Sequence, residues 1–216
     1  MNILIVSAHP DDEILGVGGT IGRHIELGDR ASVCIVTKAY TPEWSEEYME
    51  NKISEQKKVD TFLGITKRYN LDLPTVRLNT LPHGALNKKI IDIVEQANPD
   101  IIYTHFENDM NYDHTLIFRA VMVATRPPKQ IEVRCFETLS ETEWNNKAFA
   151  PNMWIEISPH IETKVKAFNI YKSEVKQYPH PRSSEGIKIL AQKRGMEFCV
   201  PFAEAFQVVR RYWVCE

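Results

Sequence analysis

The chain has 216 residues and a formal net charge of −3, from 26 lysine and arginine residues against 29 aspartate and glutamate residues. This balance gives no general attraction to nucleic acid or to anionic membranes, and we expect neither as a partner. Its 43% hydrophobic and 25% charged residues are ordinary for a globular protein, and the length favours a single domain over 1–216.

The sequence shows the pattern of neither a membrane span nor a secretory signal peptide. No apolar run approaches the ~20 residues of a membrane span, and the chain starts directly with a strand-like segment. Scattered cysteines without a C-x-x-C pair are typical of buried, reduced thiols, so we expect a cytoplasmic protein. These cysteines are Cys34, Cys135, Cys199 and Cys215.

The first twenty residues hold the most informative pattern. Asn2–Ser7 contains an apolar, β-branched run, which predicts a strand buried on both faces of a parallel sheet. His9, Asp11, Asp12 and Glu13 follow at once. Ligands of open α/β sheets bind where the chain leaves the carboxyl end of a strand, and clustered acids there need a positive charge nearby. We therefore predict a metal site on this loop.

The spacing within the loop sharpens the prediction. His9 and Asp12 are placed so that an imidazole and a carboxylate can converge on one cation, which leaves Asp11 free to face whatever that cation binds. A catalytic zinc takes about three protein ligands, so a third is expected from elsewhere. The alternative is that the acids only begin a helix, where negative charge is favourable. We prefer that alternative for Glu13, but not for His9 with Asp12.

The remaining elements alternate between helix and strand, which predicts parallel βαβ units. The glycines of the first helix are expected to let it pack closely on the sheet, and 54–58 is interpreted as the charged, solvated face of the second helix. A serine cap is expected at Ser158. The expected helices are 13–27, 44–63, 86–96, 115–125, 158–176 and 184–194; the expected strands are 31–37, 101–105, 130–139 and 153–157; 67–73 is strand or irregular, 178–184 is a loop, and 203–214 is helix or strand.

A second polar cluster follows the strand expected at Ile101–His105. Residues 106–114 read F-E-N-D-M-N-Y-D-H. His114, at the start of the next helix, can reach the mouth of the sheet, while Asp113 caps or orients. His105 is explained equally well as a core histidine, because buried polar groups are normally satisfied.

These residues carry a resemblance. The segment A-H-P-D-D-E after a first strand, with a later D-H opening a helix, is similar to the LmbE/PIG-L family of zinc-dependent de-N-acetylases. The stretches Y-P-H-P-R-S at 178–183 and A-E-A-F at 203–206 also resemble family patterns. The resemblance implies an α/β fold, namely a Rossmann-like three-layer sandwich with a mostly parallel central sheet.

The resemblance further implies that His9, Asp12 and His114 hold Zn²⁺, and Fe²⁺ or Co²⁺ would tolerate the same ligands. Asp11 would be the general base that takes a proton from the metal-bound water. The implied reaction removes the N-acetyl group, as acetate, from an amino sugar, a glycoconjugate or a nucleotide-sugar precursor. The implied partner is this small N-acetylated molecule, and assembly into a homo-oligomer stays open.

One position departs from the family pattern. Many members carry a histidine where Asn111 stands, three residues before the ligand histidine. An amide can donate a hydrogen bond but cannot supply a proton. The proton for the leaving amine would then come from Asp11 after it is protonated, or from His180 or His105 if the fold brings one close; we prefer Asp11, with His180 as a helper. The candidate catalytic residues are therefore Asp11, Asn111, Asp113 and His180.

Two other functions use the same residues. A metal-dependent phosphoesterase would need a second metal about 3.5–4 Å from the first, held by Glu13, Asp109 or Asp113. A non-catalytic α/β module would bind metal and ligand without turnover. Aromatic and arginine side chains suit sugar faces and phosphates, and the candidates to line a sugar or nucleotide-sugar pocket are Trp44, Tyr112, Arg126 and Arg182.

Overall fold

A computed structural model describes residues 1–212 of the chain. Within these residues, one seven-stranded sheet has the order β3-β2-β1-β4-β5-β7-β6. The first five strands in this order are parallel, β7 pairs antiparallel with β5, and β6 pairs antiparallel with β7, which confirms the expected mostly parallel α/β fold. The strands are β1 (Asn2–Ser7), β2 (Arg30–Lys38), β3 (Lys67–Pro74), β4 (Ile101–His105), β5 (Glu132–Phe136), β6 (Met153–Glu156) and β7 (Ala203–Arg210).

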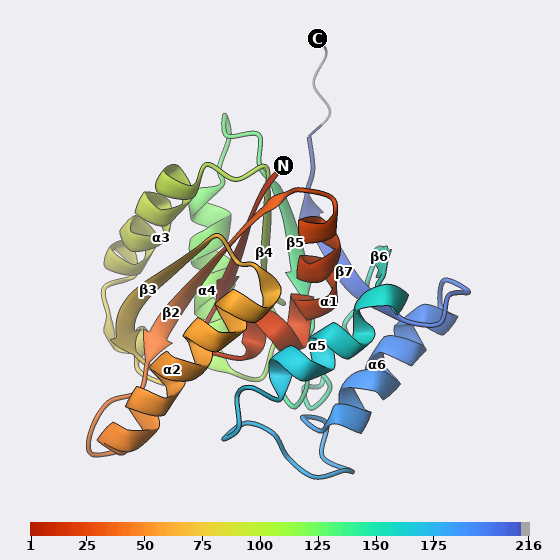
Figure 1. The fold of residues 1–216 in the computed structure, drawn as a ribbon. Helices are drawn as coiled ribbons and strands as arrows, with labels where there is room; N and C mark the ends of the chain where they lie inside the picture. Colours follow the sequence, from red (N-terminus) through yellow and green to blue (C-terminus); the bar gives the residue numbers. More distant parts are fainter. Residues whose placement is uncertain (213–216) are drawn as a thin grey trace.

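Helices cover both faces of the sheet and make three layers (Figure 1). One face carries α1, α2, α5 and α6, and the other carries α3 and α4. Every helix within 1–212 is too short or too polar to traverse a lipid bilayer. The helices are α1 (Asp12–Glu26), α2 (Glu46–Leu63), α3 (His83–Ala97), α4 (Tyr112–Ala124), α5 (Ile161–Phe168) and α6 (Ser184–Met196), with 3-10 turns η1 (Leu78–Thr80) and η2 (Ser158–His160).

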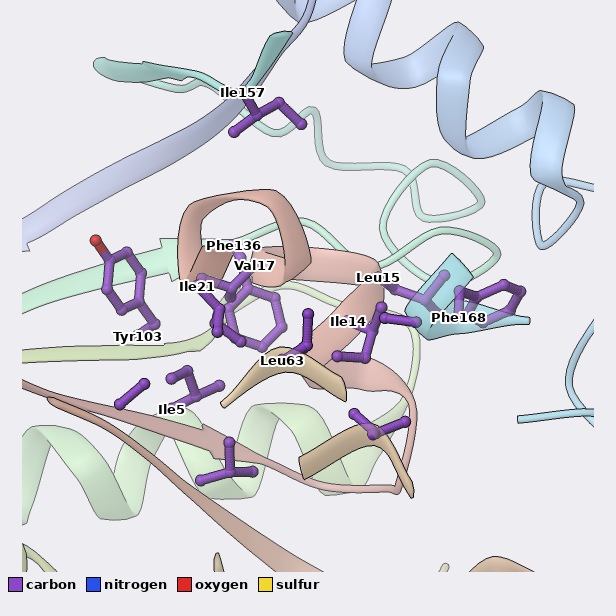
Figure 2. Packing of buried hydrophobic residues seen from close by; sticks show 14 of the residues in the cluster. Ile5, Ile14, Leu15, Val17, Ile21, Leu63, Tyr103, Phe136, Ile157 and Phe168 are labelled. Atoms are coloured by element: carbon purple, nitrogen blue, oxygen red, sulfur yellow. The ribbon is translucent and has the colours of Figure 1, made fainter. Parts of the chain in front are cut away.

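The strand β1 is apolar from Ile3 to Val6 because these residues have no solvent face. Ile3 and Ile5 pack into the cluster beneath α1, whereas Leu4 and Val6 pack into the cluster beneath α3 and α4. Figure 2 shows the first cluster, in which Ile5 lies with side chains of α1 and of the neighbouring strands. Alternate side chains of a strand point to opposite faces, so a strand between two helical layers buries both sets.

Helix boundaries follow local chemistry. Ser45 and Ser183 precede α2 and α6, and their hydroxyls accept hydrogen bonds from the backbone N–H groups of Tyr48 and Gly186. Gly64 ends α2 in the left-handed conformation, with φ of 80°. These signals are local, which is why the position of α2 was predictable to within two residues.

Close packing of α1 depends on its glycines. A Cβ at Gly16 would overlap the ring of Phe136 in β5, which confirms the predicted close approach to the sheet. Gly19 meets Ile157, beside β6, in the same way, and Gly18 faces α5. Gly18 and Gly19 therefore make room for elements other than the parallel strands.

The helix expected over 158–176 is wrong in extent. A 3-10 turn precedes α5, which ends at Phe168, and the side chain of Ser158 caps neither element. After Phe168 the chain turns so that buried Tyr171 donates a hydrogen bond of 2.6 Å to Oε1 of Glu13. The helix thus ends where the chain turns toward this tertiary contact, which the local sequence does not predict.

Other boundaries also differ from the predictions: α3 begins at His83 instead of 86, and the strand expected over 130–139 is shorter, at Glu132–Phe136. α4 begins at Tyr112 instead of 115, because Asn111 caps it by accepting a hydrogen bond from the backbone N–H of Asp113. The segment 203–214, left open as helix or strand, forms β7 through Arg210, and residues 213–216 lie outside the described part.

The cysteines are only partly as expected. Cys34 and Cys135 are buried and free, and burial raises the pKa of the Cys34 thiol to about 12. Cys199 is exposed, contrary to the prediction, because it lies in the turn after α6. Cys215 lies outside the described residues.

Candidate active site

Two loops at the carboxyl ends of neighbouring strands meet at one edge of the sheet. Because β1 and β4 are paired, the loop that leads into α1 and the loop that leads into α4 lie side by side (Figure 1). The first loop contributes His9 and Asp12, and the start of α4 contributes His114. One ligand-type atom from each lies within 4.8 Å of the others.

The spacing of these atoms fits a bound cation. Oδ2 of Asp12 lies 3.2 Å from Nδ1 of His9 and 3.3 Å from Nε2 of His114, and the two ring nitrogens are 3.4 Å apart. A tetrahedral zinc with bonds of about 2.0–2.1 Å sets its ligand atoms about 3.3 Å apart. Oδ1 of Asp12 is buried without a hydrogen-bond partner among residues 1–212. Two imidazoles and a carboxylate with an unsatisfied oxygen therefore suit zinc.

Asp109 orients one of the two imidazoles. Its Oδ2 lies 2.9 Å from Nδ1 of His114, and its Oδ1 accepts a hydrogen bond of 2.5 Å from the hydroxyl of Thr142. The contact turns Nε2 of His114 toward Asp12. A carboxylate behind a histidine in this way fixes the tautomer and direction of the ring.

Asp113 stands behind the other imidazole. Its Oδ2 lies 3.5 Å from Nε2 of His9 and accepts a hydrogen bond of 2.7 Å from the backbone N–H of Val76. Of the two roles left open for Asp113, capping falls to Asn111, and the contact of Asp113 with His9 fits the orienting role. Asn111 also lines the cavity described below.

Asp11 sits in an unusual backbone conformation at the tip of the first loop. Its φ of 133° is a strained value for a residue with a Cβ, and its N–H donates a hydrogen bond of 2.9 Å to Oε2 of Glu13. The carboxylate is buried and accepts a hydrogen bond of 3.2 Å from Nη1 of Arg182. Burial raises the pKa of Asp11 to about 8, against the opposing charge of Arg182.

The contacts of Glu13 are those of a residue that supports the structure. Besides the N–H of Asp11, its carboxylate accepts hydrogen bonds from the Tyr171 hydroxyl at 2.6 Å and from Arg68 at 3.2 Å. It lies in the first turn of α1, where a negative charge is favourable. Glu13 thus holds the strained loop in place.

His105 is a satisfied core histidine. Its ring is fully buried and stacks on His114, with ring centroids 3.6 Å apart. Its Nε2 accepts a hydrogen bond of 2.8 Å from the backbone N–H of Ala8, so that nitrogen carries no proton. Burial, together with the neighbouring His114, holds the pKa of His105 well below its ordinary value.

His180 lies apart from the cluster. It does not line the cavity; its Nδ1 accepts a hydrogen bond of 3.1 Å from the backbone N–H of Arg182. Its ring stands edge-on to Trp144, with centroids 5.8 Å apart. The contacts of His180 shape the loop that presents Arg182 to Asp11.

A cavity of about 270 Å³ opens beside the cluster, with His9 and Asp11 in its wall. Of the aromatic and arginine residues expected to line such a pocket, Trp44 and Arg182 do so, whereas Arg126 and Tyr112 do not. The site is therefore accessible to a small molecule from one side.

Sequence reasoning missed the ionic contacts around Arg182. Its guanidinium lies 3.5 Å from both Glu141 and Glu174, and Glu174 forms an ion pair of 2.6 Å with Lys52 of α2. These residues come from separate elements and form no sequence motif. A glutamate near an arginine-containing loop is too common a pattern to have signalled the contact.

Comparison with known proteins identifies the family. Residues 4–125 match the family described as PIG-L: GlcNAc-PI de-N-acetylase, which is more than half of the chain. The chain belongs to the PIG-L family of deacetylases. It is 27% identical over 172 residues to the uncharacterized deacetylase YaiS of Escherichia coli K12, covering 76% of this chain and 82% of YaiS.

Solved structures share the fold of this PIG-L family chain. The N,N'-diacetylchitobiose deacetylase of Pyrococcus horikoshii superposes with a TM-score of 0.76 at 18% identity, covering 96% of this chain and 83% of that one. GalB of Pseudomonas putida, a 4-carboxy-2-hydroxymuconate hydratase, superposes with a TM-score of 0.77 at 19% identity, covering 100% and 99%. The fold thus accompanies more than one reaction, and it is the family match that makes this chain a hydrolase of the deacetylase family.

Proposed function

We propose that this PIG-L family member is a zinc-dependent hydrolase that removes the N-acetyl group from an N-acetylated amino sugar or sugar conjugate. The observation that carries the proposal is the meeting of His9, Asp12 and His114, with ligand atoms within 4.8 Å, beside buried Asp11 in a cavity wall. These three side chains would hold the ion. Zinc, when bound, supplies a Lewis acid for the acetamide carbonyl and lowers the pKa of water toward about 7.

Asp11 is the proposed general base. Its carboxylate faces the cavity, and its raised pKa suits proton transfer near neutral pH. It accepts a proton from the attacking water and returns it to the nitrogen of the leaving amine, so that acetate and a free amine are formed. Arg182 keeps the carboxylate directed through its hydrogen bond.

Asn111 and Asp113 have supporting parts in this proposal. The Oδ1 atom of Asn111 is engaged with the N–H of Asp113, which leaves its amide N–H₂ to donate a hydrogen bond to the substrate. Asp113 positions the ring of His9. The proposal assigns no proton transfer to His105, whose Nε2 already accepts a hydrogen bond from Ala8, or to His180, which does not line the cavity.

The phosphoesterase alternative has less support. The three carboxylates proposed to hold a second metal are all engaged: Glu13 with Arg68 and Tyr171, Asp109 with Thr142, and Asp113 with the backbone of Val76. The second His/Asp group, which contains His105 and Asp109, shares His114 with the first. One ion is therefore the better match.

Metal analysis combined with an acetate-release screen over N-acetylated sugars tests the proposal. We expect about one zinc per chain, and activity that a chelator removes and zinc restores. Asp11→Asn should keep the metal and lower acetate release by about 10²–10⁴-fold. Asp92→Asn, at an exposed site on α3, is the matched control and should change neither quantity.

The outcomes separate the three functions. Unchanged acetate release in Asp11→Asn would refute the role of that carboxylate. About two metal ions per chain with phosphate-ester hydrolysis would favour the phosphoesterase. Bound metal without turnover of any N-acetylated sugar would favour the non-catalytic module.

A further inference from the structure

One wall of the cavity comes from the polar side of α2. Lys52, Glu55 and Gln56 are each 8% exposed or less. The interpretation of 54–58 as only a solvated face is therefore wrong for Glu55 and Gln56. Buried polar side chains normally have hydrogen-bond partners, so the partner of each of these side chains indicates its role.

Two of these three side chains have a partner in the protein, although Nζ of Lys52 and Oε2 of Glu55 make no hydrogen bond among residues 1–212. Glu55 accepts a hydrogen bond of 3.0 Å from the backbone N–H of Lys172, and Lys52 pairs with Glu174 at 2.6 Å. Gln56 is the uncharged one of the three and lines the cavity, and its Oε1 is likewise buried with no hydrogen-bond partner among residues 1–212. An unpartnered buried amide oxygen is unfavourable, so a group that enters the cavity with a hydrogen to donate is its natural partner.

The charges of the cavity indicate what kind of group that is. Lys52 and Arg182 both contact Glu174, at 2.6 and 3.5 Å, and Lys38 lies 4.0 Å from Asp72. The two largely buried cations of the cavity, Lys52 and Arg182, thus already have a carboxylate beside them, whereas Lys38 is about half exposed. A phosphate on the substrate would have to displace a carboxylate and then face it, which is costly in a partly buried site. A sugar hydroxyl needs no counter-charge, and a glutamine amide can both donate to it and accept from it.

We propose that Gln56 is the residue that determines sugar specificity, by binding a hydroxyl group of an uncharged N-acetylated sugar on the α2 wall of the cavity. This inference rests on the proposed deacetylase function and narrows its substrate class. Sugars that carry phosphate, including nucleotide-linked ones, are then poor substrates.

Steady-state acetate release from N-acetylglucosamine and from its 1- and 6-phosphates tests this inference. The unmodified sugar should have a kcat/KM at least about tenfold above both phosphates. Gln56→Leu should raise KM for the unmodified sugar by about tenfold, the effect of one lost hydrogen bond, with kcat within about twofold. Gln56→Asn, which keeps a shorter amide, should give a smaller rise, and it serves as well if the leucine variant folds poorly.

Gln207 offers a matched control. Its Oε1 in β7 is also buried without a partner among the described residues, but Gln207 does not line the cavity. Gln207→Leu should leave KM unchanged. A KM in Gln56→Leu that equals the wild-type value, or a preference for either phosphate, would overturn the inference while leaving the deacetylase intact.

A binding measurement keeps the two proposals separable. If no sugar releases acetate, the proposed function fails, and saturation-transfer NMR with N-acetylglucosamine then decides about Gln56. A signal from the wild-type protein that is lost in Gln56→Leu would support the hydroxyl contact. Equal signals from both proteins, or none from either, would overturn it.

Discussion

At the scale of single residues, the orientation of His114 depends on a carboxylate that is not itself in the ligand group. Asp109 holds Nδ1 of the ring at 2.9 Å and is held in turn by Thr142. Outer contacts of this kind contribute about 10- to 100-fold to metal affinity. We therefore predict that Asp109→Asn lowers zinc affinity by about that factor, measured by competition with a chromophoric chelator.

The control for this prediction is again Asp92→Asn, an isosteric change on an exposed helix face. Circular dichroism should show both variants folded. An affinity in Asp109→Asn equal to that of the control would mean that other contacts of His114, such as its stacking on His105, are enough to direct the ring.

The sequence indicated His9, Asp12 and His114 because each follows a strand predicted from a short apolar run, and strand ends of a parallel sheet share one edge. It could not indicate that Arg182 lies against Asp11, because 171 positions separate them and no periodicity connects them. Gln56 was hidden for another reason. Its neighbours in sequence are charged, so only the packing of α2 shows that its amide is buried.

At the scale of elements, side chains from two other elements form hydrogen bonds with the backbone in the middle of α1. The carboxylate of Glu204 in β7 accepts hydrogen bonds from the N–H groups of Gly19 and Thr20, at 2.9 and 2.7 Å. Lys164 of α5 donates to the carbonyl of Leu15 at 2.7 Å and pairs with Glu204 at 2.6 Å. This buried pair ties α5 and β7 to the helix that begins at the candidate metal site.

Breaking this pair should be costly. Glu204→Gln removes the charge that compensates buried Lys164, and we predict a loss of about 3–5 kcal/mol in the free energy of unfolding, measured by urea denaturation. Lys164→Met added to Glu204→Gln should recover part of that loss, because no uncompensated charge remains. A loss below about 1 kcal/mol in the single variant would contradict the buried-pair account.

The elements themselves were predictable wherever the signal is local. Ser45 and Gly64 mark the ends of α2, and the apolar runs of β1 and β4 mark central strands. The end of α5 was not predictable, because the turn after Phe168 brings Tyr171 to Glu13, a residue that is distant in the sequence. The strand β7 was ambiguous for a similar reason: its state is decided by the antiparallel pairing with β5 and β6.

At the scale of the whole molecule, the candidate site occupies the carboxyl edge of the parallel strands, and a second polar network holds the layers together elsewhere. His24, in the last turn of α1, lies 2.7 Å from Asp29 in the turn before β2 and 2.9 Å from the Tyr103 hydroxyl in β4. That hydroxyl also accepts a hydrogen bond of 2.7 Å from Arg134 in β5. The imidazole of His24 thus connects α1 to the turn before β2 and to Tyr103 in β4, and through Tyr103 to Arg134 in β5.

This network should make stability depend on pH in a predictable direction. Burial lowers the pKa of His24 below its ordinary value of 6.5, against the opposing effect of Asp29. Below pH 6.5 the unfolded chain therefore binds a proton that the folded protein excludes, so stability falls as the pH decreases through that value. His24→Gln retains an amide for hydrogen bonding but cannot titrate. Between about pH 7.5 and about pH 5.5, the wild-type protein should lose more free energy of unfolding than this variant.

Urea denaturation of chelator-treated protein at the two pH values measures this difference, and it removes any contribution from metal release. The histidines of the candidate site titrate in both proteins, so they cancel in the comparison between wild type and His24→Gln. Replacement of an exposed histidine, His83→Gln, controls for the loss of one imidazole from the chain. Equal losses in wild type and His24→Gln would mean that the protonated ring is accommodated in the fold, with Asp29 as its counter-charge and the Tyr103 hydroxyl turned to accept.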